Sequence, residues 1–170
     1  MSTTVPATAA LLTRRASDDL LTLLRNIPDD RLSWKPADST RTVIEQLQEC
    51  ATVNQNWAIA IRERGFSVGS PDSAELRAFM DAFMGTRESC AETIERSTSA
   101  LIVAINGVSE EETGRRINID TIKPGTITLA EACFYSYWHM SYHEGQINLL
   151  QSIYGDNAHH HGYHVEAPPS

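Results

Sequence analysis

His139 and His143 lie four residues apart in "YWHMSYHEGQ", inside a stretch whose apolar spacing is typical of a helix. Side chains at positions i and i+4 share one helix face, so two imidazole nitrogens could bind one metal ion. The zinc-protease motif needs a glutamate directly after its first histidine, and Met140 stands there instead. The spacing alone therefore leaves two interpretations open: a metal site, or two aromatic side chains that fill a groove between helices.

Two further residues of this helix lie beside the histidine pair. Gln146 continues the histidine face and could orient a metal ligand or a metal-bound water. Tyr142 could direct its hydroxyl group into a pocket. Packing and hydrogen bonding inside a bundle are the more common roles of both residue types. We therefore treat Gln146 and Tyr142 as candidates for the surroundings of the site, and not as ligands.

Four stretches carry the apolar spacing of long helices, which predicts an all-α four-helix bundle. Thr40 or Ser39 is expected to cap the second helix, Gly65 to end it, and Gly85 to kink the third. The segment 106–128 holds β-branched residues and a "KPG" turn, which predict a short extended or hairpin excursion before the last helix. The predicted helices are 7–25, 42–64, 73–105 and 128–154.

The chain length of 170 residues predicts a single domain, which we place at 1–156, followed by a His-rich tail at 157–170. Four of the six histidines lie in this tail and could bind metal adventitiously. The tail histidines are His159, His160, His161 and His164.

Charge and composition exclude several classes of protein. Fourteen Lys and Arg face 22 Asp and Glu, a net charge of −8, which argues against a nucleic-acid surface. No apolar run approaches the ~20 residues of a membrane span, and the N-terminal residues lack a secretory signal. We therefore expect a cytoplasmic protein that binds neither nucleic acid nor membrane. Cys50, Cys90 and Cys133 form no CxxC pair and are interpreted as small core residues.

Three segments resemble the DinB-like superfamily. "HMSYHEGQINLLQSIYGD" is similar to the last helix of that family, with its His-x-x-x-His-x-Gly-Gln pattern, and "RTVIEQLQECATVNQNW" is similar to the second helix. "LSWKPADSTRT" resembles the segment before that helix, so the resemblance covers 31–57 and 129–155 directly. It implies a four-helix bundle, frequent homodimers, and a metal held by one histidine of the second helix and two of the last.

This chain departs from the family pattern at one ligand. His139 and His143 match the last-helix pair, but the second-helix position holds Glu49. Either Glu49 replaces the imidazole as a ligand, or the metal site is lost and Glu49 pairs with a histidine. We favour the first interpretation, because the substitution placed another ligand type there. Asn56 shares the face of Glu49, whereas Cys50, an alternative thiolate ligand, is directed about 100° away into the core ridge.

The resemblance implies a metal-dependent enzyme of thiol-dependent S-transferase or hydrolase type. A site of two histidines and one carboxylate suits zinc or nickel, and also manganese or iron. The ion would activate a thiol or water, so the expected partners are a small-molecule substrate, a low-molecular-weight thiol, and a second copy of the chain. The alternative is a non-catalytic bundle that binds a small ligand or a partner and retains a degenerate metal site.

Overall fold

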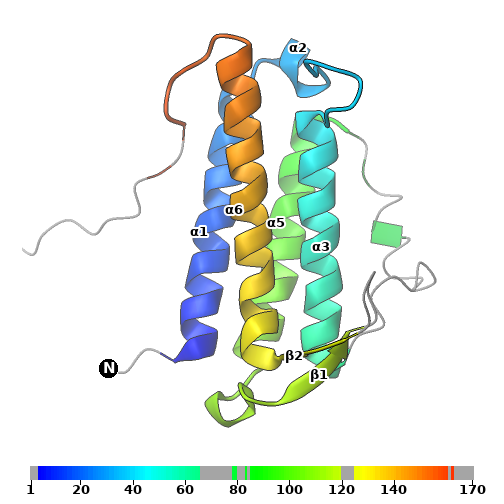
Figure 1. Cartoon of the computed structure of the whole chain (residues 1–170), viewed down its shortest axis with the longest axis vertical. Helices are drawn as coiled ribbons and strands as arrows, with labels where there is room; N and C mark the ends of the chain where they lie inside the picture. The colour runs from blue at the N-terminus through cyan, green and yellow to red at the C-terminus, as the bar shows by residue number, and fades with distance from the viewer. Residues whose placement is uncertain are drawn as a thin grey trace, which may run out of the picture.

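The computed structural model describes residues 4–65, 78–79, 83, 85–119, 125–160 and 162, and its main feature is a bundle of four long helices (Figure 1). This confirms the predicted fold class. The helices are α1 (Val5–Asn26), α3 (Val43–Glu63), α5 (Arg87–Asn106) and α6 (Leu129–Ile153).

Helices α1 and α6 run in one direction along the bundle, and α3 and α5 run in the other (Figure 1). Each of α1 and α3 packs against both α5 and α6. At one end of the bundle, Arg64 after α3 donates a hydrogen bond to the carbonyl of Gly107 after α5, and the Val5 amide donates to Glu110. The antiparallel pair α3 and α6 is the one that positions the candidate site.

Helix α3 begins and ends one residue or more away from the expected positions. Thr42, and not Thr40 or Ser39, is the N-cap: its hydroxyl accepts from the Glu45 amide at 3.1 Å. At the other end Arg64, and not Gly65, adopts the left-handed conformation with φ 55°. The Arg64 guanidinium is held by Glu112 at 3.0 Å, which offsets the strain of this conformation in a residue with a Cβ.

Helix α6 begins with a capping box. The Thr128 hydroxyl accepts from the Glu131 amide at 3.2 Å, and the Glu131 carboxylate accepts from the Thr128 amide at 2.6 Å. These two bonds satisfy amides that a helix start otherwise leaves without partners. The cap fixes where α6 begins and therefore which of its side chains face α3.

Replacing Thr128 by alanine should lower the free energy of unfolding by about 1 kcal/mol, because the cap hydroxyl is lost while the helix sequence is otherwise unchanged. Urea unfolding followed by circular dichroism measures the change. Ser152→Ala is the matched control, since Ser152 is exposed in the last turn and bonds only a carbonyl of its own helix. A loss as large in Ser152→Ala as in Thr128→Ala would contradict the capping role.

The third predicted helix, 73–105, is wrong as one continuous element. Gly85 has φ 68°, which interrupts helical geometry, and Thr86 then caps α5, which begins at Arg87. The Arg87 guanidinium bonds the carbonyl of Ile27 and pairs with Asp29, so tertiary contacts fix this start. Most of 66–84 lies outside the described residues, although 78–79 are helical.

A one-turn helix that the sequence analysis did not predict, α2 (Asp29–Leu32), follows α1. The sequence analysis treated its residues as loop, because a single turn is too short to show helical spacing. Its Leu32 side chain is buried, and its Asp29 pairs with Arg87. Helix α2 therefore links the end of α1 to the start of α5.

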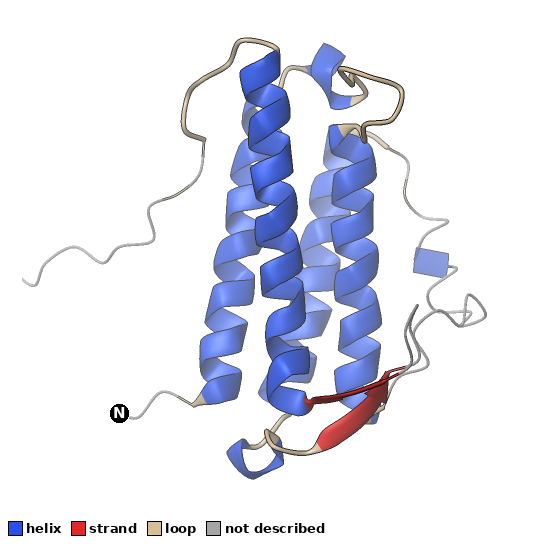
Figure 2. Cartoon of the chain, in the orientation of Figure 1, coloured by secondary structure: helices blue, strands red, loops and turns tan. Residues whose placement is uncertain are grey.

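The excursion before α6 is the predicted hairpin. β1 (Arg116–Ile119) pairs antiparallel with β2 (Gly125–Thr128), with Ile117 opposite Ile127, and Figure 2 shows the two strands across one end of the bundle. Ile117 is buried and packs in a cluster with Leu129 at the start of α6. The hairpin therefore closes the core below α6. Its connection, 120–124, lies outside the described residues.

The core divides into two apolar clusters that meet at a band of buried polar side chains. One cluster includes Leu20, Leu47 and Met140, and the other includes Trp57 and Leu129. All three cysteines are buried, as predicted. In the band, the Asn54 amide donates to Thr98 and the Thr98 hydroxyl donates to Ser17, each at 3.2 Å. Other buried polar residues of the bundle include Thr13, Ser136 and His139.

The described part of the tail returns to the bundle. His160 Nε2 lies 2.8 Å from Asp156 Oδ2, and the Gly162 amide donates to Asp19. His161 and His164 lie outside the described residues. Within the described ranges, no helix combines the length and apolar character needed to cross a membrane.

Candidate metal centre

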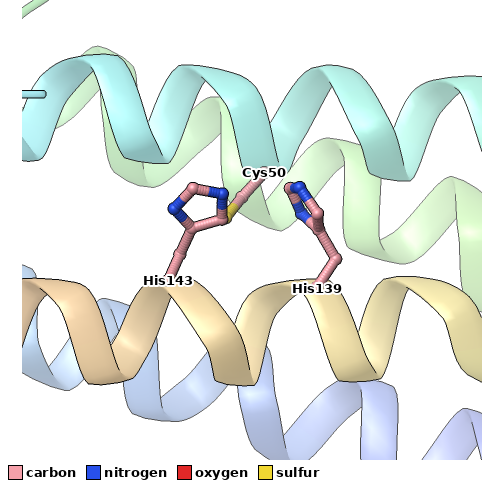
Figure 3. A group of neighbouring side chains, drawn as sticks. All are labelled: Cys50, His139 and His143. Atoms are coloured by element: carbon pink, nitrogen blue, oxygen red, sulfur yellow. The ribbon is translucent and has the colours of Figure 1, made fainter. Parts of the chain in front are cut away.

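Helices α3 and α6 bring the candidate ligands together in the interior of the bundle. His139 and His143 project from α6 toward α3, with ring centroids 4.6 Å apart (Figure 3). Both side chains are buried, since His143 is 0% and His139 9% exposed. The pair is therefore part of the core, where a polar nitrogen needs a partner.

Glu49 on α3 faces both histidines. Its Oε1 lies 3.7 Å from His139 Nε2 and 3.7 Å from His143 Nε2, while its Oε2 pairs with the guanidinium of Arg41. Two ligands of a tetrahedral zinc ion at ordinary bond lengths are about 3.4 Å apart. Each of these two oxygen–nitrogen distances would therefore need to shorten by only a few tenths of an ångström for the carboxylate oxygen to share an ion with that nitrogen.

Gln46 fixes the orientation and tautomer of His143. Its amide nitrogen donates to the Arg41 carbonyl at 3.5 Å, which leaves its Oε1 to accept from His143 Nδ1 at 3.2 Å. With the proton on Nδ1, His143 Nε2 carries the free lone pair. A second residue that holds the far nitrogen in this way is typical of metal-bound histidine.

Two imidazole nitrogens have no hydrogen-bond partner among the described residues. They are Nε2 of His143 and Nδ1 of His139, and both are buried. An unsatisfied buried polar atom costs roughly 1–3 kcal/mol, so such atoms are rare in folded proteins. A metal ion accepting the lone pair of His143 Nε2 would remove this penalty for that atom. The donor set therefore fits the ion that the family resemblance implies.

Cys50 also lies beside the histidines. Its Sγ and one nitrogen of each imidazole all lie within 4.8 Å of one another (Figure 3). The expectation that Cys50 points into the core is confirmed, but the expectation that this direction separates it from the histidines is wrong, because the histidines are themselves in the core. Burial raises the pKa of the Cys50 thiol far above its ordinary value, so without an ion the sulfur is protonated.

Burial also keeps both imidazoles neutral. Loss of hydration, together with the neighbouring His143, lowers the pKa of His139 to about 4, against the opposing effect of Glu49. Burial likewise lowers the pKa of His143. Neutral imidazole is the form that binds metal, so the pair is ready for an ion at neutral pH without first releasing a proton.

A cavity of about 460 Å³, lined in part by Gln46, lies next to the site and is contacted by some of the remaining candidate residues. Tyr142 and Gln146 line this cavity, and the Tyr142 ring contacts the His143 ring with centroids 5.3 Å apart. Asn56 is half-buried on α3 and does not line this cavity. The structure therefore places Tyr142 and Gln146 beside the site, whereas the role of Asn56 stays a prediction.

Two residues of the site were missed by the sequence analysis. Gln46 precedes Glu49 by three residues and Cys50 by four, so helical spacing places it on their side of α3 and could have identified it. Arg41 lies before the N-cap of α3, where no helical spacing applies, and its role depends on the path of the preceding loop.

Comparisons with known proteins agree with this fold. The family model of the DinB superfamily matches residues 12–147. A search of curated proteins found no match. Among solved structures, a DinB-like protein from Bacillus subtilis is similar with a TM-score of 0.62 and 15% identity, covering 86% of this chain and 91% of that chain. That likeness concerns the fold, and the family match includes residues of all four long helices and ends at Ile147 in α6. The chain belongs to the DinB superfamily.

Proposed function

We propose that this protein is a metal-dependent enzyme whose divalent transition metal is held by His139, His143 and Glu49. The observation that supports the proposal most strongly is the equal 3.7 Å separation of Glu49 Oε1 from both Nε2 atoms, one of which is buried without a partner. Two imidazoles and a carboxylate suit zinc or nickel, and also manganese or iron. A bound ion of this kind lowers the pKa of a thiol or water ligand and so supplies a nucleophile at neutral pH.

The residues of the chain have distinct roles in this proposal. Gln46 holds His143 with Nε2 free, and Arg41 holds Oε2 of Glu49 so that Oε1 faces the histidines. In this proposal a small thiol or water approaches the site from the adjacent cavity, which Gln46 and Arg41 line. Transfer of a small thiol to a second substrate, or hydrolysis, is the reaction type that follows. A homodimer remains a prediction from the family resemblance.

Glu49 is preferred to Cys50 as the third ligand. Glu49 is about one-third exposed and reaches both Nε2 atoms with one oxygen, whereas the Cys50 thiol is fully buried and must first lose a proton. Only the donor set with Cys50 contains sulfur, and a sulfur ligand gives bound cobalt a charge-transfer absorption band. The donor set can therefore be decided by spectroscopy.

The cobalt-substituted protein should show no sulfur-to-cobalt charge-transfer band until a small thiol is added. Titration with 2-mercaptoethanol should then produce the band in wild type and equally in Cys50→Ala. Glu49→Gln should bind cobalt at least about tenfold more weakly, because loss of a ligand costs no less affinity than loss of a residue that hydrogen-bonds to a ligand. Ethylene glycol, which lacks the thiol, is the matched control.

Two results would contradict the proposal. A band present before thiol addition and absent in Cys50→Ala would make Cys50 the ligand in place of Glu49. Failure of wild type to bind cobalt would favour the alternative, a non-catalytic bundle that binds a small ligand or partner. The existing Arg41–Glu49 ion pair is the observation that favours this alternative, since it already satisfies one carboxylate oxygen without a metal.

A further inference from the structure

The cavity beside the metal centre has one polar wall and one apolar wall. The loop before α3 contributes Ser39 and Arg41, whose hydroxyl and guanidinium groups are hydrogen-bond donors. The second half of α6 contributes Tyr142, Leu149 and Leu150. A volume of about 460 Å³ falls in the range of sites that hold small organic molecules.

Two residues that line this cavity, Gln46 and Arg41, contact the candidate ligands. Gln46 lines the cavity, accepts from His143 and donates to the Arg41 carbonyl. The Arg41 side chain pairs with Oε2 of Glu49. A molecule in the cavity would therefore meet the guanidinium of Arg41 and lie next to the residues that hold Glu49 and His143.

Arg41 has capacity to bind a further anion. Its side chain is 57% exposed, and a guanidinium carries five N–H donors in a planar fork, of which the ion pair with Glu49 uses a part. When the other oxygen of Glu49 binds an ion, the charge of that carboxylate is shared between the ion and Arg41. Glu49 would then neutralise less of the positive charge of Arg41, so the guanidinium would attract a second carboxylate on its cavity side more strongly.

We propose that this cavity binds the carboxylate group of the substrate or thiol, with Arg41 as the residue that selects it and Ser39 as a second donor. The proposal rests on the proposed function, because the reactive end of the same molecule must reach the metal centre. The apolar part of the ligand lies against Tyr142, Leu149 and Leu150.

A carboxylate fits this cavity better than a phosphate. Arg41 is the only cationic side chain among the described residues that line it, and the nearby Glu49 and Glu45 are anionic. A phosphate dianion usually requires more than one cation or several free backbone amides. The Glu45 carboxylate already accepts from the Thr42 amide at the start of α3.

The test compares two thiols that differ only in the anionic group. Isothermal titration of the zinc-loaded full chain with 3-mercaptopropionate and with 3-mercapto-1-propanol measures the preference for carboxylate. Wild type should bind the carboxylate thiol about tenfold more tightly, as a charge-assisted hydrogen bond contributes roughly 1.5–3 kcal/mol. In Arg41→Gln the preference should fall to less than about twofold.

Lys35→Gln is the matched control, because it removes one positive charge from the same loop outside the cavity. Lys35 donates to the Asp38 carbonyl and should be replaceable with no change in the preference. Arg41→Lys keeps the charge but loses the fork, so an intermediate preference is expected. The thiol titrations use saturating zinc, and the zinc affinity is measured for every variant. It should be unchanged in Lys35→Gln and lower in Arg41→Gln, because Arg41 holds the ligand Glu49.

The possible failures can be told apart. Suppose that zinc is bound, but the carboxylate preference survives in Arg41→Gln or is absent from wild type. Either result overturns the carboxylate site and leaves the proposed function intact. Wild type without zinc overturns both. Displacement of 3-mercaptopropionate by inorganic phosphate at lower concentration than by propionate overturns the carboxylate assignment in favour of a phosphate ligand.

Discussion

His143→Ala should lower the affinity for zinc by more than about 100-fold. The substitution removes the ligand whose Nε2 is free and buried. In other metal sites, removal of a residue that merely hydrogen-bonds to a ligand already costs 10–100-fold in affinity. Competition against a chromophoric chelator at neutral pH measures the dissociation constant of the tightest site. The full-length chain is used, so that weaker binding by the tail histidines appears as separate equivalents.

The control for His143→Ala is a chain whose four tail histidines are replaced by asparagine. This variant should keep the tight site and lose only the weaker equivalents, because His160, one of the two described tail histidines, pairs with Asp156. If the tail variant loses the tight site, or if His143→Ala changes the affinity by less than about threefold, zinc is held elsewhere in the chain.

Gln46→Leu should lower the zinc affinity by about 10- to 100-fold although Gln46 is not a ligand. Leucine has a similar volume but cannot accept from His143 Nδ1, so neither the tautomer nor the ring orientation of His143 remains fixed. The same chelator competition measures the effect, with circular dichroism to confirm that the bundle is folded.

Gln48→Leu is the matched control, because Gln48 is a half-buried residue of the same helix that makes no contact with the histidines among the described interactions. Its zinc affinity should stay within about twofold of wild type. Equal affinities in Gln46→Leu and wild type would show that the hydrogen bond to His143 does not support metal binding.

Most of the helical framework could be predicted from the sequence, because long apolar stripes fix helix identity strongly. The break at Gly85 could not be predicted, since apolar residues continue on both sides and an interior glycine costs only about 1 kcal/mol. Contacts of Arg87 with Ile27 and Asp29, far away in sequence, decide that a new helix begins there. Similarly, Arg64 takes a conformation that glycine usually takes, because Glu112 holds it.

Helical spacing and the family resemblance were sufficient to predict Glu49, His139 and His143 as the candidate ligands. The structure brings His139, His143 and Glu49 together. The sequence could not show how far α6 is rotated toward α3, and this rotation decides that the histidines are buried and that Cys50 lies beside them. Arg41 depends on a loop path that leaves no periodic signal.

The most direct test of the metal centre is the metal content of the untagged full-length protein, purified without metal columns and analysed by inductively coupled plasma mass spectrometry. We predict about one equivalent of a divalent transition metal in the chain with tail histidines replaced, and loss of that equivalent when Glu49→Ala or His143→Ala is added. Absence of bound metal, with none taken up from added zinc, nickel or manganese, would contradict the metal centre.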